Sequence, residues 1–206
     1  MRRLRIAAAM IALAALASFA ETIRFSADRV ESVLAKGKER TVLTGKAKVT
    51  TGKLSITADS IELYGENFIY LDCRGSVRVE DSERGIRLQA PRLYYDRDRK
   101  LTRAQGPSVL EDDENKLILK AEWIEYDEVN EVMLAQVAVR ILKENLSCRA
   151  EYAVFRRGDS LLELTGAPSA YKDGDEFKAS KIVVNTETEE IKLEGEVRGS
   201  VKGEDR

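Results

Sequence analysis

The stretch that decides the fold reads LSITADSIEL, from Leu54 to Leu63. Before Ala58 the apolar residues occupy every second position, and after it they alternate again on the opposite parity. Period-two alternation is typical of a β-strand with one buried face, and a parity change would flip that face unless the strand turns a corner. Because Ala is small enough to sit inside a corner, the stretch predicts a strand that runs along one wall, bends, and continues along a second wall.

The same ten-residue pattern occurs six times along the chain. Its alanines are separated by 31, 32, 31, 29 and 29 residues and are Ala27, Ala58, Ala90, Ala121, Ala150 and Ala179. A fixed period of about 30 residues predicts one repetitive architecture rather than several unrelated domains.

A second pattern lies between these copies, with apolar residues alternating around a central Gly and no change of parity. Its regular copies are centred on Gly45, Gly75, Gly166 and Gly195. Gly inside a strand favours a bulge or a sharp bend, so this pattern predicts the return arm of each repeat. Two copies depart from it: we expect Ala135 to replace the Gly in one, and the pattern around Gly106 to be one residue out of step.

Short polar turns, such as 65–67 and 96–99, separate successive arms. Turns of this length join antiparallel neighbours, whereas parallel strands need a crossover of about a dozen residues. We therefore expect an all-β fold after the N-terminal segment, a meander of twelve arms folded lengthwise into a trough. A right-handed parallel β-helix with about 30 residues per coil is the structural alternative.

The first twenty residues have the layout of a secretory signal peptide, with Arg2, Arg3 and Arg5, an apolar run over 6–19, and cleavage expected after Ala20. An uncleaved membrane anchor is the alternative, although the run is shorter than the ~20 residues that span a bilayer. We divide the chain into the signal peptide (1–20), a β-domain (21–201) and a charged tail (202–206), and we expect an exported protein.

Composition excludes several functions. The net charge of −2 provides no basic field for nucleic acid. The chain has no His, which removes the commonest general base and metal ligand, so we expect no enzyme, no cofactor and no metal site. The acidic run 111–114 falls in a predicted turn and is interpreted as solvated. Trp123 and the pair Tyr94-Tyr95 fall within strand patterns and are interpreted as wall residues.

The two cysteines, Cys73 and Cys148, occupy inward positions five arms apart. At ~4.8 Å per neighbouring strand they lie too far apart for a disulfide. We expect two free, buried thiols that behave as small apolar residues.

The inward positions together form a long apolar surface. They are rich in Leu, Ile, Val and Ala with few large aromatics, which favours a trough with room for a narrow apolar ligand such as an acyl chain. The inward residues that we expect to line this groove are Ile56, Ile61, Leu63, Ile69, Leu71, Val77, Leu88, Leu93, Leu119, Ile124, Leu146, Phe155, Leu164 and Ile182. The alternative is a structural β-solenoid or assembly protein with a filled interior.

Three segments carry a resemblance to a known family: ADSIELY from Ala58, GSVRV from Gly75 and APRLYYD from Ala90. With the rest of the β-domain they resemble the LptA/OstA-like family. The resemblance implies a V-shaped antiparallel β-jellyroll in the periplasm that shields lipopolysaccharide acyl chains between the inner and outer membranes. It also implies partners with related jellyrolls, one anchored in the inner membrane and one in the outer-membrane assembly.

The first and last arms, 23–34 and 190–201, are the edges of a sheet that does not close. Unpaired backbone groups at such edges accept an added strand from a partner. The sequence therefore predicts head-to-tail contacts, and the resemblance implies that the jellyroll partners use the same edges.

Overall fold

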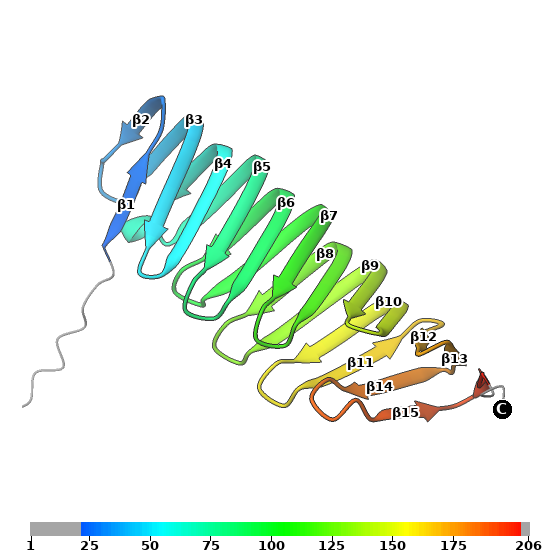
Figure 1. Cartoon of the computed structure of the whole chain (residues 1–206). Coiled ribbons are helices and arrows are strands. Elements are labelled where there is room, and N and C mark those ends of the chain that lie inside the picture. The colour runs from blue at the N-terminus through cyan, green and yellow to red at the C-terminus, as the bar shows by residue number, and fades with distance from the viewer. Residues whose placement is uncertain (1–21, 203–206) are drawn as a thin grey trace, which may run out of the picture.

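The chain forms one long antiparallel β-sheet that is folded over on itself (Figure 1). The structure is a computed structural model that describes residues 22–202. The expected signal peptide, its cleavage after Ala20 and most of the charged tail lie outside the described residues.

Within the described residues the sheet has sixteen strands, and a single 3-10 turn interrupts the chain between two of them. In chain order the elements are β1 (Ile23–Ser26), β2 (Arg29–Val33), β3 (Arg40–Thr51), β4 (Leu54–Tyr64), η1 (Glu66–Phe68), β5 (Tyr70–Asp81), β6 (Ile86–Asp96), β7 (Leu101–Asp112), β8 (Leu117–Asp127), β9 (Val132–Lys143), β10 (Leu146–Arg156), β11 (Leu161–Thr165), β12 (Ser169–Lys172), β13 (Asp175–Lys178), β14 (Lys181–Asn185), β15 (Ile191–Glu194) and β16 (Arg198–Ser200).

The strands make up twelve bent arms. Strands β3 to β10 are each one arm, and the pairs β1/β2, β11/β12, β13/β14 and β15/β16 are arms that break at the corner. Successive arms pair antiparallel throughout, as in the register that places Val49 opposite Ile56. The predicted meander is confirmed, and the parallel β-helix alternative is wrong for the described residues.

Each arm bends at the centre of its repeated pattern, next to the Ala or the Gly, where the ladder shifts register. Gly75 has φ 74°, and a Cβ on it would lie 2.2 Å from the carboxylate of Asp59, the residue that follows the corner Ala58. The same arrangement recurs at Gly45, whose carbonyl accepts a hydrogen bond of 2.8 Å from the Asp28 amide. Only Gly combines a left-handed backbone with room for the neighbouring side chain, which is why the return arms need it there.

The expectation that the pattern around Gly106 is out of step is wrong. Gly106 has φ 82°, its missing Cβ faces Pro91, and the ladder shifts register between Gln105 and Ser108 as it does at the other corners. Two of the inward positions beside it, Thr102 and Ser108, are polar but buried. Their polarity hides the apolar rhythm in the sequence.

The assignment of Ala135 as the substitute for Gly is also wrong. Ala135 is buried in the wall opposite Ala153, and the corner of β9 falls two residues later. There Val137 and Ala138 adopt φ 65° and 53°. A β-branched residue in the left-handed region is strained, so the corner of β9 differs from the Gly corners.

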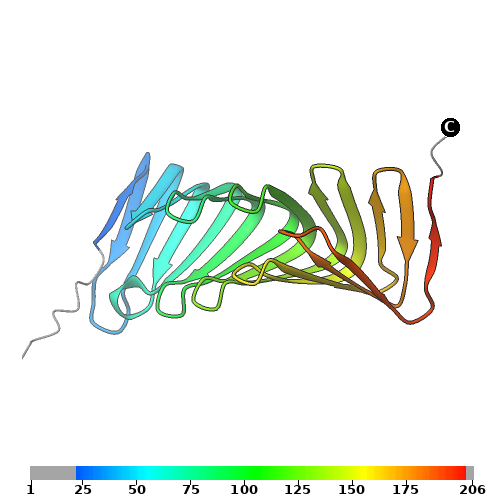
Figure 2. The same cartoon turned by 60° about the horizontal axis from the view of Figure 1, so that its bottom comes forward.

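The corners divide the sheet into two walls, visible as facing layers in Figure 2. The first wall contains β2, β11, β14, β15, the N-terminal halves of β3, β5, β7 and β9, and the C-terminal halves of β4, β6, β8 and β10. The second wall contains β1, β12, β13, β16 and the remaining halves. Inward side chains of both walls form one buried apolar cluster that extends from Leu43 to Val184.

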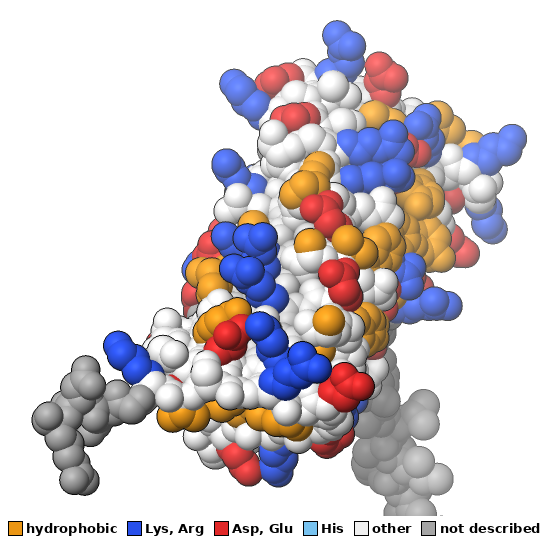
Figure 3. Space-filling view, turned by 90° about the vertical axis from the view of Figure 1, so that its right-hand side faces the viewer, with side chains coloured by type: hydrophobic (Ala, Val, Ile, Leu, Met, Phe, Trp, Pro, Cys, Tyr) orange, Lys and Arg blue, Asp and Glu red, His pale blue; other side chains and the backbone are white. Residues whose placement is uncertain are grey.

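Both ends of the sheet are edges, as predicted. Within residues 22–202, β1 and β2 pair only with β3, while β15 pairs with β14 and β16 with β13. Seen from the C-terminal end, apolar side chains reach the surface between Lys, Arg, Asp and Glu (Figure 3).

Candidate functional site

All but one of the predicted groove residues lie in the buried apolar cluster between the two walls. Each of these exposes 6% or less of its surface, and they are Ile56, Ile61, Leu63, Leu71, Val77, Leu88, Leu93, Leu119, Ile124, Leu146, Phe155, Leu164 and Ile182. The structure thus brings together side chains that are 126 residues apart in the sequence (Ile56 to Ile182).

Ile69 is the exception. It follows the turn η1, where Asn67 and Phe68 have φ 56° and 53°, and β5 begins only at Tyr70. Ile69 is half-buried, and it is Phe68 that packs against the cluster. The alternation of Ile69 with Leu71 suggested one continuous strand, but the two left-handed residues turn the chain before that strand starts.

The gap expected between the walls is not present in this arrangement. Exposures this low leave no water-sized space beside the inward side chains just named, so the two walls pack directly on each other. A ligand as wide as an acyl chain therefore fits beside these side chains only if the two walls move apart.

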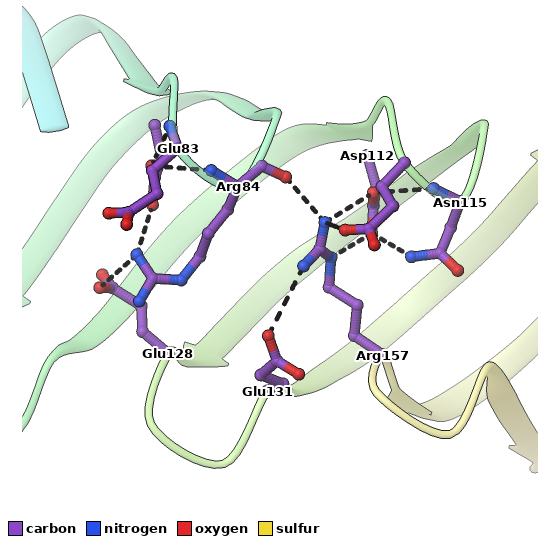
Figure 4. Close-up of polar contacts among 9 residues, drawn as sticks. Glu83, Arg84, Asp112, Asn115, Glu128, Glu131 and Arg157 are labelled. Atoms are coloured by element: carbon purple, nitrogen blue, oxygen red, sulfur yellow. Dashed lines mark hydrogen bonds and ion pairs between the residues drawn. The ribbon is translucent and has the colours of Figure 1, made fainter. Parts of the chain in front are cut away.

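The edges of the two walls that lie opposite the corners, which we call the rims, meet at a line of turns. We call this line the mouth. Each of these turns of the first wall faces a turn of the second wall that lies three arms earlier in the chain. The β8–β9 turn faces the β5–β6 turn, and the β10–β11 turn faces the β7–β8 turn (Figure 4). Charged side chains fill this line, whereas the interior behind it is apolar.

Arg157, in the β10–β11 turn of the first wall, makes most of the contacts across the mouth. Its Nε donates to Asp112 Oδ2 at 2.8 Å, and its Nη2 donates to the Arg84 carbonyl at 2.7 Å and to Glu114. Glu131, from its own wall, lies 3.7 Å from Nη1. The side chains of Arg157 and Asp112 are 5% and 0% exposed, so this ion pair is withdrawn from water.

Two further ion pairs cross the mouth. Arg84 in the second wall binds Asp81 at 2.9 Å and approaches Glu128 of the first wall at 3.7 Å. Towards the C-terminus, Lys172 of the second wall pairs with Glu189 of the first. The mouth is thus closed at several points by charges rather than by apolar side chains.

Glu128 is the titratable group at the mouth that burial perturbs most clearly. Burial raises its pKa to about 7, against the opposing effects of the Arg84 charge, the Lys100 charge and a hydrogen bond with Tyr95. The nearby Asp81 carboxylate also raises the pKa of Glu128. A carboxyl with its pKa raised this far is partly neutral near pH 7, which weakens its attraction to Arg84.

Sequence reasoning missed the residues of the mouth. A weak signal exists, because an Asp ends a strand at intervals of 15, 16 and 15 residues: Asp81, Asp96, Asp112 and Asp127. These carboxylates cap their own turns, as Asp112 Oδ1 does by accepting the Asn115 amide at 3.1 Å. That spacing predicts capped turns, but it does not reveal that Arg157 reaches Asp112 across 45 residues of sequence.

A polar cleft of about 490 Å³ lies beside Arg157 at the mouth. Both walls line it with charged and polar side chains, including Lys116 and Lys143 of the second wall and Glu131 and Glu187 of the first. Lys143 Nζ donates to the Asn115 carbonyl at 3.0 Å. The cleft offers hydrogen-bonding groups of both signs directly above the apolar interior.

The acidic run 111–114 is paired with arginines rather than simply solvated. Asp112 and Glu114 bind Arg157, while the other two carboxylates bind Arg87 on the outer face. Among residues 22–202 no group of His, Cys, Asp or Glu side chains has the arrangement of a metal site.

The two thiols are free and buried, as predicted. Burial raises the pKa of Cys148 to about 12 and the pKa of Cys73 still further. Both are inert while the walls are closed, because a buried thiol does not ionise.

In the described part of the chain, no helix has the length and apolarity needed to cross a membrane. Residues 24–190 match the protein family described as LptA/(LptD N-terminal domain) LPS transport protein. Comparison with curated proteins finds no match. Among solved structures, LptH from Pseudomonas aeruginosa, the LptA-homologous periplasmic component of the lipopolysaccharide transport device, is 12% identical with a TM-score of 0.28, and the match covers 89% of this chain and 96% of LptH.

Proposed function

Because the chain belongs to the family of LptA and the LptD N-terminal domain, we propose that it transports lipopolysaccharide or a similar acylated lipid, holding the acyl chains between its two walls. The match covers nearly all of the described β-domain, so the whole jellyroll takes part in the proposed role rather than one fragment of it. No catalytic step is included in this role.

The observation that carries the proposal is the unbroken apolar interior. Inward side chains from nearly all of the arms join one cluster, so that an acyl chain bound anywhere along it remains shielded from water. Each buried CH₂ is worth about 0.8 kcal/mol relative to water, but close to nothing relative to a membrane. An interior of this kind accepts an acyl chain from a bilayer and releases it again without trapping it.

The two edges support the proposed partners. Phe25 and Val30 of the first arm point to the inward side yet remain about half exposed, and Ile191 and Leu193 of the last arm are only partly buried. A strand added to either edge would cover these side chains and continue the interior. We assign these edges to head-to-tail contacts with further copies, and with an inner-membrane anchored and an outer-membrane jellyroll protein.

The proposed location is the periplasm. The signal-peptide layout of residues 1–20 and the family together support export, with cleavage after Ala20. N-terminal sequencing of the exported protein tests this assignment directly.

The packed interior favours one alternative, a structural jellyroll that holds no ligand. A core without water-sized space is what a purely structural domain needs. Extraction separates the two functions: the full chain, exported by a bacterium that makes lipopolysaccharide, carries an acylated lipid in native mass spectra if it transports lipid. A protein free of lipid, which also binds none when lipopolysaccharide is added, contradicts the proposal.

Photo-cross-linking locates the bound lipid. Strand β10 offers a matched pair of aromatic positions, since Phe155 points inward and is fully buried whereas Tyr152 points outward. A benzophenone amino acid at position 155 is expected to cross-link to lipopolysaccharide, and the same group at position 152 is not. Equal cross-linking from both positions would show that lipid coats the outside.

A further inference from the structure

The ion pairs at the mouth lie where the two walls can part. Arg157 and Arg84 connect turns of opposite walls, and the apolar cluster lies directly behind them (Figure 4). The bends at the Ala and Gly corners join the walls along the other side, so separation of the walls must occur at this line of turns.

A charged closure differs physically from an apolar one. Burying the Arg157–Asp112 pair removes both ions from water, and this desolvation cost offsets much of their mutual attraction. When the turns part, both ions regain their hydration. A row of apolar side chains would instead expose its surface to water at about 25 cal/mol per Å², with nothing gained in return.

The cross-mouth contacts are also few and local. Apart from the Lys172–Glu189 pair nearer the C-terminus, Arg157 holds the β10–β11 turn to the β7–β8 turn, and Arg84 holds the β5–β6 turn to the β8–β9 turn. Both contacts involve residues of turns, and the backbone ladder of each wall runs through the strands behind them. Breaking these contacts therefore leaves the strand pairing of both walls intact.

We propose that the contacts of Arg157 and Arg84 form a reversible latch, and that an acyl chain enters and leaves sideways through the mouth that this latch closes. The proposal rests on the proposed lipid transport and specifies its route. In this route the acyl chain passes between the rims while the polar part of the lipid stays in the 490 Å³ cleft beside Arg157. The alternative route is end-on, through the edges of the sheet.

The first test needs no lipid, because Cys148 and Cys73 report on the interior. Both thiols are buried on the inward faces of opposite walls, so a small maleimide reaches them only when the walls separate. We expect Arg157→Met to raise the labelling rate of Cys148 at least tenfold at low urea. Arg103→Met is the matched control, since Arg103 pairs with Glu125 at 2.6 Å within one wall, and its labelling rate stays that of the wild type.

The urea dependence of labelling distinguishes a local opening from unfolding. Opening of the latch exposes little new surface, so the faster labelling of Arg157→Met is expected to depend weakly on urea. Labelling no faster than in the wild type contradicts the latch. A rise with the full urea dependence of global unfolding contradicts it as well.

A reversible cross-link tests the route, even if Arg157→Met does not fold. In Arg84→Cys/Glu128→Cys, a cleavable bis-maleimide joins the two walls across the mouth, while Cys73 and Cys148 remain buried. Lipid uptake is expected to fall at least tenfold and to recover when the linker is cleaved. The control, Arg103→Cys/Glu125→Cys, joins neighbouring strands within the first wall and leaves uptake unchanged.

The outcomes separate this proposal from the function on which it rests. Normal uptake by the protein linked across the mouth shows that lipid enters end-on, and it overturns the latch while leaving transport intact. Absence of uptake in the unlinked, wild-type and control proteins overturns the proposed function itself.

Discussion

The first arm and the arm behind it carry the same pattern but bury it differently. Phe25 lies directly opposite Val49, and Val30 opposite Leu43, with all four side chains on the inward face. Phe25 and Val30 are 49% and 45% exposed, whereas Val49 and Leu43 are 1% and 0% exposed. The alternation therefore determines which face is inward, and a neighbouring arm on each side determines whether that face is buried.

The same contrast separates the middle of the mouth from the ends. In the middle, Arg84 and Arg157 hold the two walls together over a packed interior. At the first arm, no strand beyond β1 and β2 covers the inward side chains within residues 22–202. In the proposed function, the middle shields the lipid and the ends receive another protein.

The largest expected effect on stability comes from comparing two single variants, each of which places an Arg at one member of an opposing pair. Leu43→Arg buries an unpaired guanidinium in the interior, and we expect it to lower the free energy of unfolding by about 4 kcal/mol or more. Val30→Arg, directly across the ladder, has access to water and should change the free energy of unfolding by about 0.5 kcal/mol or less. Urea denaturation followed by circular dichroism measures both.

Similar losses in the two variants would show that the first arm is covered in solution. Such a result would point to self-association through that edge. Repeating the measurement over a range of protein concentrations would then show whether the loss in Val30→Arg depends on self-association. The comparison between the arms holds only if Val30→Arg stays close to the wild type.

The next effect concerns pH at the mouth. Glu128 has a pKa raised to about 7 by burial, compared with its ordinary value of 4.5, so the folded state binds an extra proton between these values. The ionised carboxylate therefore opposes folding above pH 7, and this cost disappears as the pH falls from 7 towards 4.5. We expect Glu128→Gln to gain up to about 3 kcal/mol in unfolding free energy at pH 8 and little at pH 5.

Glu163 provides the control for Glu128, because its pKa shift has the opposite sign. On the outer face, hydrogen bonds from Lys181 and Arg156 lower the pKa of Glu163. The ionised Glu163 carboxylate stabilises the folded state above pH 4.5, and this stabilisation is lost as the pH falls below that value. Glu163→Gln should therefore lose a small amount of stability at pH 8. Stability curves from pH 4 to pH 9 for both variants contradict this account if Glu128→Gln keeps the pH dependence of the wild type.

Much of the fold is present in the sequence because each arm repeats one physical rule. The alternation around Ala58 and Gly75 gives the strand, its inward face and its corner, and the short turns give antiparallel order. The rule fails where a polar side chain takes an inward position, as at Thr102 and Ser108, or where Val137 occupies a corner. In these arms the ladder on both sides holds the register that the residues themselves do not specify.

The candidate site was only partly predictable for a different reason. Inward positions follow from local periodicity, and Leu88 or Leu119 can be assigned from its own strand alone. The contact of Arg157 with Asp112 depends on how far one wall is offset from the other, here by three arms. That offset results from the accumulated twist and bend of the whole sheet, which no short segment encodes.

The smallest effect tests the corner of β9, which within residues 22–202 is the one return-arm corner that lacks Gly. Val137 in the middle of the sheet has φ 65° and is 53% exposed, whereas the corners nearer the two ends carry Gly45 and Gly195. Asn tolerates the left-handed region better than a β-branched residue, and little burial is lost at this position. We expect Val137→Asn to raise the free energy of unfolding by about 0.5–1 kcal/mol.

The matched control for Val137 is Val109, an outward residue of β7 whose φ is not positive. Val109→Asn should lower stability slightly, because Asn is disfavoured in a regular strand. Urea midpoints of the two variants therefore move in opposite directions if the β9 corner is strained. A loss of stability in both would mean that the side chain of Val137 supports the bend, and that Gly at the other corners relieves crowding rather than backbone strain.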